Sequence, residues 1–214
     1  MNTIKKRAQL VYSRLDQISP PQIQFLKQQD PFRFMISVIL SAQTTDKMVN
    51  IVTGPLFSMF PTVKDLANAP QETVEEIIHP TGFYKMKAKN IIACAQALVD
   101  KTIPSTIDEL VRLPGVGRKT ANCVVGDVFH KPAIIVDTHF GRVVHRLGLV
   151  DTKDPEKIEF QIASLLDPSK HYRFSMTANL FGREVCHAKK PSCNECPLRD
   201  LCPSADAFLQ VSSM

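Results

Sequence analysis

The stretch that decides the fold is LPGVGRKTAN, residues 113–122, which lies between two segments with helical periodicity. Gly115 and Gly117 can adopt positive φ angles without Cβ strain, so the chain can reverse tightly there. We therefore expect a hairpin between two helices, with backbone N–H groups exposed at the start of the second helix. Such groups bind anions, and phosphate is the natural ligand. A plain interhelical turn is the alternative, but Arg118 and Lys119 directly follow the glycines and favour the phosphate site.

Helical patterns dominate the rest of the chain. Pro31 stands where a first-turn proline belongs, and Thr45 with Asp46 can cap the next helix. Thr106 with Glu109 forms a capping box for a helix that is expected to end near Leu113. The one strand-like run, AIIVD at 133–137, is too short and solitary to make a sheet. The sequence therefore predicts an all-α fold. Its main helices are expected at 4–16, 84–99, 118–129, 138–147, 154–166 and 170–183.

Composition indicates a folded protein without a membrane span. Of the 214 residues, 44% are hydrophobic, which is enough for a core and argues against disorder. The N-terminal segment is charged throughout and lacks the apolar region of a signal peptide, so we expect a soluble, cytoplasmic protein. The formal net charge of +5 permits a polyanionic partner without demanding one.

The cysteines fall into two groups. Cys94 and Cys123 lie alone in apolar helical patterns and are interpreted as core residues. The other four crowd into CHAKKPSCNECPLRDLC, and in a chain of this kind such a cluster holds a metal rather than disulfides. Their spacing alone does not choose between Zn²⁺ and a [4Fe–4S] cluster. These four are Cys186, Cys193, Cys196 and Cys202.

Taken together, these motifs resemble the helix-hairpin-helix DNA glycosylases of base excision repair, and specifically the endonuclease III branch. The resemblance rests on LPGVGRKTAN followed by VDTH, on SAQTTD at 41–46, on TGFYKMKAKNI at 81–91, and on the four-cysteine tail. It covers nearly the whole chain. It implies a [4Fe–4S] cluster held by the four cysteines, and double-stranded DNA with damaged bases or abasic sites as the partner.

The resemblance also implies how the chain is organised. It predicts two all-helical lobes and a monomer, associated with the nucleoid if the source is bacterial. One lobe is a helical barrel spanning residues 22–131, with the hairpin motif at about 106–129. The other lobe joins residues 1–21 to 132–214 and carries the cluster. Lys119 then belongs to the first lobe and Asp137 to the second, with the site expected in the cleft between them.

By resemblance, Lys119 is the nucleophile of a glycosylase that is also an abasic-site lyase. A free lysine amine has a pKa of about 10.4, so it must be deprotonated before it can attack C1′ of a nucleotide. A low-dielectric pocket, nearby cations and a helix N-terminus all disfavour its charged form. The simpler interpretation is a solvated lysine at a helix start. Adenine-mismatch glycosylases, which are similar but monofunctional, usually carry serine at this position.

Asp137 precedes a predicted helix and is well suited to cap it. The resemblance implies that it is also the catalytic carboxylate, stabilising positive charge on the sugar and assisting proton transfers. Both roles can hold at once.

Four further residues are expected to contact DNA. By resemblance, Gln43 fills the space that a flipped-out base vacates, and Phe83 is an apolar wedge, at a position where leucine is common in the family. The alternatives are a loop amide for Gln43 and core packing for Phe83. Lys189 and Lys190, between two of the cysteines, suit phosphate contacts, unless they are simply solvated.

The leading functional hypothesis is a base-excision DNA glycosylase with lyase activity toward oxidised pyrimidines. A mismatch glycosylase for thymine or uracil on the same scaffold is the first alternative. A non-catalytic helix-hairpin-helix DNA-binding protein with a structural metal is the second. Lys119 together with Asp137 argues against this last possibility.

Overall fold

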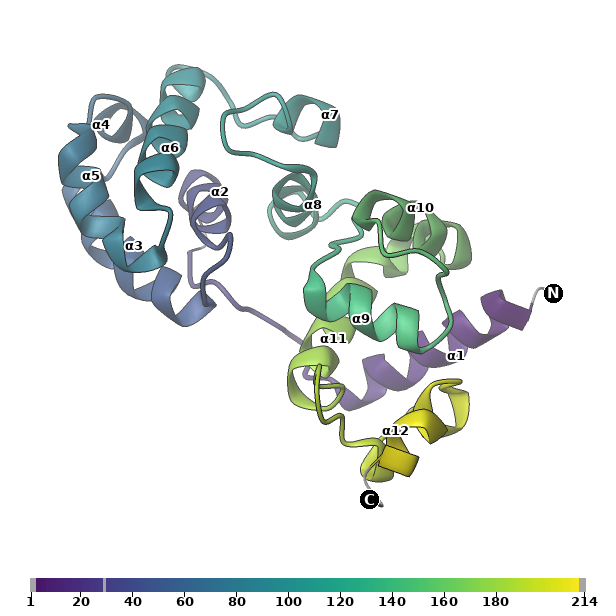
Figure 1. Ribbon diagram of the computed structural model, residues 1–214. Coiled ribbons are helices and arrows are strands. Elements are labelled where there is room, and N and C mark those ends of the chain that lie inside the picture. The colour runs from purple at the N-terminus through teal and green to yellow at the C-terminus, as the bar shows by residue number, and fades with distance from the viewer. Residues whose placement is uncertain (1–2, 29, 212–214) are drawn as a thin grey trace. The chain divides into compact units, whose positions relative to one another are not determined.

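The computed structural model describes residues 3–28 and 30–211, and the chain forms two compact units (Figure 1). We call Gln24–His130 the hairpin unit, and Met1–Ile23 with Lys131–Met214 the cysteine unit. Across the described ranges every regular element is an α-helix or a short 3₁₀ helix, which confirms the all-α prediction. Residues 133–137 form no strand there. Within the same ranges, no helix combines the length and apolarity needed to cross a bilayer.

The hairpin unit is built around α2 (Pro31–Leu40). Its start is well determined, because Asp30 accepts a hydrogen bond from the backbone N–H of Arg33 and proline occupies the first turn. The helix is apolar on all sides and is buried from Phe34 to Leu40, so it must lie inside the unit, where it contacts α3, α6 and α8. The helices around it are α3 (Asp46–Met59), α4 (Val63–Ala67), α5 (Gln71–Ile78), η1 (His79–Thr81), α6 (Tyr84–Leu98), α7 (Ile107–Leu110) and α8 (Arg118–Asp127).

The cysteine unit has its own apolar core. Helix α11 packs against α9 and α1, and the rings of Phe140 and Phe174 meet edge to face at the centre, 5.7 Å between centroids. Its helices are α1 (Thr3–Ile18), α9 (Thr138–Arg146), α10 (Pro155–Leu165), η2 (Pro168–Lys170), α11 (His171–Glu184), η3 (Cys193–Glu195), η4 (Arg199–Leu201) and α12 (Ala205–Val211).

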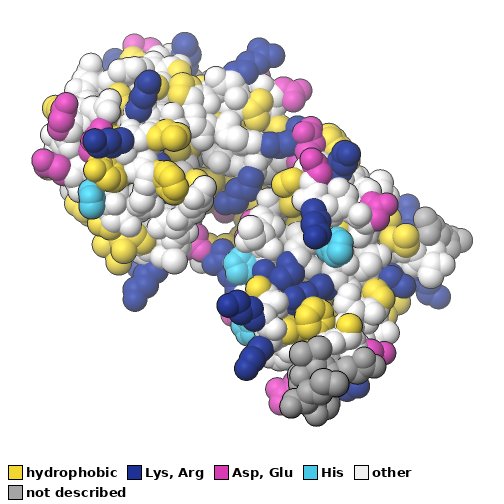
Figure 2. Space-filling view, in the orientation of Figure 1, with side chains coloured by type: hydrophobic (Ala, Val, Ile, Leu, Met, Phe, Trp, Pro, Cys, Tyr) yellow, Lys and Arg dark blue, Asp and Glu magenta, His cyan; other side chains and the backbone are white. Residues whose placement is uncertain are grey.

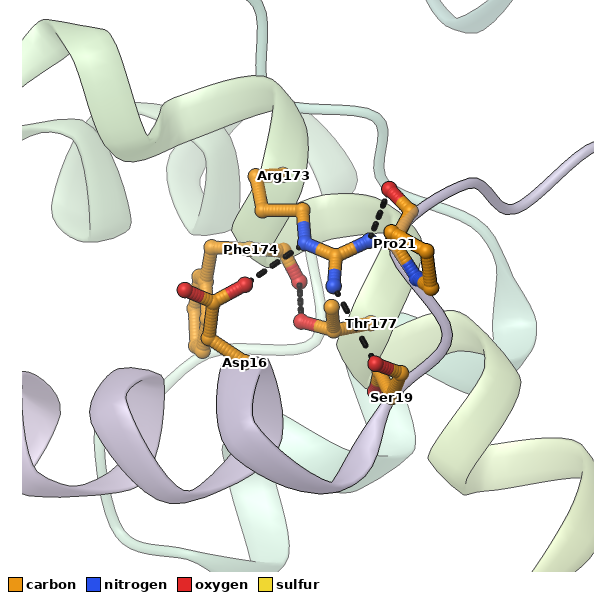
Figure 3. A network of polar contacts seen from close by, with 6 residues as sticks. All are labelled: Asp16, Ser19, Pro21, Arg173, Phe174 and Thr177. Atoms are coloured by element: carbon orange, nitrogen blue, oxygen red, sulfur yellow. Dashed lines mark hydrogen bonds and ion pairs between the residues drawn. The ribbon is translucent and has the colours of Figure 1, made fainter.

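Arg173 of α11 fixes the end of α1 and the segment after it (Figure 3). Its Nε donates to Asp16 Oδ1 at 2.7 Å, and its terminal nitrogens donate to the backbone carbonyls of Pro21 at 3.2 Å and Ser19 at 3.4 Å. A partly exposed ion pair alone contributes little stability. The two carbonyl bonds matter more here, because they give this irregular backbone partners on α11.

The predicted helix starts are confirmed where the signal is local. Thr45 accepts from Met48 N at 3.2 Å, and Thr106 accepts from Glu109 N at 3.4 Å. The capping box at Thr106 is only half formed, because the Glu109 carboxylate accepts from the Thr106 hydroxyl. Helix α7 ends at Leu110 rather than near residue 113. Pro114 disfavours a helical conformation at the residue before it.

Candidate functional site

The predicted hairpin between α7 and α8 is present, and its two glycines differ. Gly115 has φ of 75°, as expected. The tight turn is closed by Val116 N, which donates to Leu113 O at 3.1 Å. The expectation of a positive φ at Gly117 is wrong: its φ is −86° and ψ 173°, because this residue is the extended N-cap of α8.

Of the two hairpin glycines, only Gly115 has a steric reason to be glycine. A Cβ at Gly115 would lie 2.8 Å from Cβ of Asn90 on α6, so only glycine lets the hairpin pack so close to that helix. A Cβ at Gly117 would meet nothing within 4 Å. This open space lies at the N-terminus of α8, where glycine supplies no side-chain acceptor for the first N–H groups. The geometry suits the approach of an anion.

Arg118 and Lys119 occupy the first turn of α8. The Lys119 side chain is exposed, while the next residue, Thr120, is buried. The hairpin unit itself therefore does not provide the low-dielectric surroundings expected for the Lys119 amine. It does place that amine directly beside the open helix N-terminus.

Gln43 and Phe83 share an uncommon backbone conformation. Their φ angles are 54° and 50°, in the left-handed region that residues other than glycine seldom adopt. Gln43 lies in the turn between α2 and α3, and Phe83 directly precedes α6. Both side chains are exposed, Phe83 by 63%, so the core-packing alternative for Phe83 is wrong. Backbone strain of this kind is often found at functional positions.

Asp137 caps α9, as expected: its Oδ1 accepts from Phe140 N at 2.7 Å. The residue is half-buried and lines an open pocket of about 510 Å³ in the cysteine unit. Arg142, His145 and Lys153 are among the other lining residues, so the carboxylate belongs to a pocket that is rich in basic groups.

The four clustered cysteines line one pocket in the cysteine unit. Burial is the main reason why the pKa of the thiols of Cys193, Cys196 and Cys202 is raised, so metal binding must release their protons. In the described part of the chain, no three histidine, cysteine or acidic side chains converge on a point that could hold one metal ion. Four thiols around a shared pocket have the donor set of a [4Fe–4S] cluster.

Arg142 and Arg146 hold the backbone of the cysteine loop. Arg146 donates to His187 O at 2.7 Å and Ala188 O at 2.8 Å, and also to the Cys186 sulfur at 3.3 Å. Arg142 donates to Cys186 O at 3.0 Å and to Gly182 O at 2.7 Å. The sequence places both arginines on a basic face but does not reveal this role, because their partners lie about 40 residues away. Their i, i+4 spacing on α9 is the only signal.

These contacts fix the backbone just before Lys189 and Lys190, whose side chains are exposed. Figure 2 shows Lys and Arg side chains gathered over α9 and the end of α11 in the cysteine unit. The lysines are thus solvated, and they also stand on a loop whose backbone is tied to α9.

Comparisons with known proteins agree with this geometry. Residues 36–168 match the model of the HhH-GPD superfamily base excision DNA repair proteins, which defines the class of protein. Residues 186–202 match the iron-sulfur binding domain of endonuclease III. Endonuclease III of Synechocystis sp. is 41% identical over 97% of this chain and 96% of its own length.

Two solved structures are similar over almost the whole chain. A non-covalent endonuclease III–DNA complex has a TM-score of 0.91 at 36% identity, covering 98% of this chain and all of that one. A trapped endonuclease III–DNA covalent intermediate has the same TM-score at 37% identity and the same coverage. This chain belongs to the endonuclease III family.

It is accordingly a base-excision DNA repair enzyme, a bifunctional glycosylase and abasic-site lyase that acts on DNA. Its cofactor is a [4Fe–4S] cluster, and the cysteine-lined pocket fits that group. The four cysteines that line the pocket would hold the cluster as thiolates, and the Cys186 thiolate would lie within hydrogen-bond reach of Arg146.

Proposed function

We propose that this enzyme removes oxidised pyrimidines from duplex DNA, with Lys119 as nucleophile and Asp137 as the assisting carboxylate. One observation carries the assignment of the nucleophile. An exposed lysine stands in the first turn of α8, directly after a hairpin whose Gly117 leaves room for a phosphate. A phosphate bound there would bring the adjoining sugar within reach of the Lys119 amine.

The chemistry follows from a neutral amine. The lone pair of Lys119 Nζ attacks C1′, and the C1′–N bond breaks as the base departs with its electron pair and takes up a proton. The sugar ring then opens and leaves a protonated imine between Nζ and C1′. This imine acidifies the C2′ proton. Removal of that proton breaks the C3′–O bond and expels the 3′ phosphate, which cuts the strand by β-elimination.

Bound DNA and Asp137 supply the low-dielectric surroundings and the proton acceptor that the exposed Lys119 amine lacks. Lys119 is exposed in the described structure, so we infer that bound DNA desolvates its amine. The Asp137 carboxylate stabilises positive charge on the sugar and accepts protons in turn. Positioned proton transfer of this kind typically contributes about 10²–10⁴-fold in rate.

The remaining residues bind DNA. Gly115, Gly117 and Arg118 present the hairpin to one phosphate, and Lys189 and Lys190 contact others. Gln43 and Phe83 enter the stack when the damaged base is flipped out, a device suited to their exposed, left-handed turns. The four cysteines at 186, 193, 196 and 202 ligate the cluster.

At the level of the whole chain, we propose that residues 22–131 and residues 1–21 with 132–214 are the two lobes of the enzyme. The proposed form is a monomer that works on DNA in the cytoplasm.

Borohydride trapping tests the nucleophile and the substrate together. The wild-type enzyme is incubated with a duplex carrying one thymine glycol, and borohydride reduces any imine to a stable adduct. We expect an adduct with the wild type and none with Lys119→Gln. Lys85→Gln, a change at an exposed lysine of α6, is the matched control and should still be trapped. An adduct that persists in Lys119→Gln would refute the nucleophile.

The same assay separates the alternative substrates. Trapping on a duplex with an abasic site but not on thymine glycol would keep the lyase chemistry and overturn the proposed base. Duplexes with thymine or uracil opposite guanine would then test the mismatch-glycosylase alternative. No adduct on any of these duplexes would contradict the proposed Schiff-base mechanism.

A further inference from the structure

Lys87 is a buried cation that the mechanism above does not use. It lies on α6 with 5% of its surface exposed, and its Nζ donates to the backbone carbonyl of Thr81 at 2.9 Å. It shares its face of the helix with Ile91 and Cys94, which are fully buried. Burial lowers the pKa of Lys87. An apolar side chain would fill the same place without the cost of desolvating an ammonium group.

The carbonyl that Lys87 contacts belongs to a strained turn. After Thr81, Gly82 has φ of 68° and Phe83 has φ of 50°, so two successive residues adopt positive φ before α6 begins. The backbone N–H of Lys87 donates to Phe83 O at 3.0 Å. The side chain and the backbone N–H of Lys87 therefore bracket Gly82 and Phe83, on the Thr81 side and on the Phe83 side. Phe83 is the strained residue of the two, because glycine adopts a positive φ freely.

Other contacts close the base of the same turn. The Thr81 hydroxyl donates to Ile78 O at 2.8 Å, and the rings of His79 and Tyr84 are in contact at a tilt of 44°, with 4.4 Å between centroids. These contacts hold residues 78–81 and the first turn of α6. Among the side-chain bonds of the described residues, the one from Lys87 alone runs from within α6 back across Gly82 and Phe83 to Thr81.

We propose that Lys87 is a positioning residue that holds Phe83 in its exposed, left-handed conformation, ready to enter the DNA stack. This inference rests on the proposed role of Phe83 as a wedge. A hydrogen bond from an ammonium group is roughly twice as strong as one between neutral partners, so it can offset a strained backbone conformation. Without it, the Thr81–Gly82 peptide can rotate, and the Phe83 ring can turn away from DNA and pack against the surface of the unit.

A fluorescence experiment tests this directly. A duplex carries an uncleavable abasic-site analogue with 2-aminopurine opposite, whose emission rises when a wedge unstacks it. The holoenzymes compared are wild type, Phe83→Ala, Lys87→Met and the double variant. We expect Lys87→Met to lower the emission gain about fivefold, as Phe83→Ala does, and the double variant to be no worse than Phe83→Ala alone.

The controls separate positioning from general damage. Lys89→Met removes an exposed charge from the same helix and should keep the full gain. Lys87→Arg restores a cationic donor and should recover most of it. If Lys87→Met does not fold, Lys87→Gln takes its place, since its shorter amide cannot reach the Thr81 carbonyl and the same loss is expected.

The outcomes distinguish the inference about Lys87 from the proposed role of Phe83 as a wedge. A normal emission gain in Lys87→Met, with the gain lost in Phe83→Ala, overturns the inference about Lys87 and leaves the wedge intact. A normal gain in Phe83→Ala overturns the wedge itself. Additive losses in the double variant would mean that Lys87 acts on the fold and not through Phe83, which also overturns the inference.

Discussion

Asp137 shows at the residue scale how one carboxylate can carry a structural and a proposed catalytic task. Asparagine caps a helix about as well as aspartate, so Asp137→Asn should keep α9 and change stability by less than about 0.5 kcal/mol. The same change removes the negative charge, and base removal should fall about 10²-fold or more. Single-turnover excision from a thymine glycol duplex measures this loss, while thermal melting measures stability.

Asp154 provides the matched control for that experiment. It caps α10 with the same geometry, because its Oδ1 accepts from Lys157 N at 2.9 Å. Asp154→Asn should leave both excision and melting near wild type. Equal excision by Asp137→Asn and the wild type would reduce Asp137 to a helix cap.

Residues that act through local backbone bonds could be read from the sequence, and those with distant partners could not. Thr45, Thr106 and Asp137 were predictable because a cap and its partner lie three residues apart. Lys87 lies at a position of α6 that the helical period places on the buried face, but lysine is a residue type that is normally exposed. Arg146 required the fold, since the carbonyls it holds lie about 40 residues further along the chain.

At the scale of the element, the hairpin predicts opposite behaviour for its two glycines. Gly115→Ala meets a positive φ and a contact with Asn90 shorter than real Cβ contacts allow, so it should cost at least about 1–2 kcal/mol of stability. Gly117→Ala meets neither problem and should cost less than about 1 kcal/mol. Its methyl group would instead stand where we propose a phosphate binds, and affinity for an abasic duplex should fall.

The melting temperature and the affinity for an abasic duplex are measured for both variants and compared with the wild type. The hairpin is a plain interhelical turn if Gly117→Ala binds DNA as tightly as the wild type. The steric account of Gly115 is wrong if Gly115→Ala melts at the wild-type temperature.

The cysteine loop is the second element with a testable role. Removing a lysine that neutralises one phosphate should reduce the slope of log affinity against log salt by about 0.9, so Lys189→Ala with Lys190→Ala should reduce it by up to about 2. Lys5→Ala with Lys6→Ala removes the same charge from exposed positions on α1 and should leave the slope close to wild type. Binding to an abasic duplex at several salt concentrations decides the question, and equal slopes for the two double variants would mean that the loop lysines are merely solvated.

At the scale of the whole molecule, the sequence predicts the helices well and the long-range connections poorly. Periodicity and caps predicted the all-α class, because the apolar pattern and the cap that indicate a helix lie within the helix itself or directly before it. The start of a short helix at Thr106 was predictable, but its end at Leu110 was not, because Pro114 restricts only the residue directly before it. The clamp from Arg173 to Ser19 and Pro21 joins segments about 150 residues apart, and no local pattern indicates it.

Loss of the cluster should unfold part of one unit and spare the other. Cys186, Cys196 and Cys202 pack at the edge of the core of the cysteine unit, and α12 contacts η3, which begins at Cys193. Without iron, the loop between residues 186 and 202 is held at its start by bonds from Arg142 and Arg146, and near its end by bonds from Arg14 to Pro197 and Asp200. Cys196→Ser should therefore lose the cluster absorbance, and amide hydrogen exchange should accelerate across residues 186–211, while amides of the hairpin unit keep their protection.

Cys123→Ser changes a cysteine of the hairpin unit and serves as the control, because it should retain the cluster and the exchange pattern. In Cys196→Ser, the loss of protected loop amides should be accompanied by a salt slope like that of the Lys189 and Lys190 variant, since those lysines lose their fixed backbone. Unchanged exchange across 186–211 would contradict this view. It would mean that the arginine bonds suffice to order the loop, and that the cluster is not needed to present the lysines.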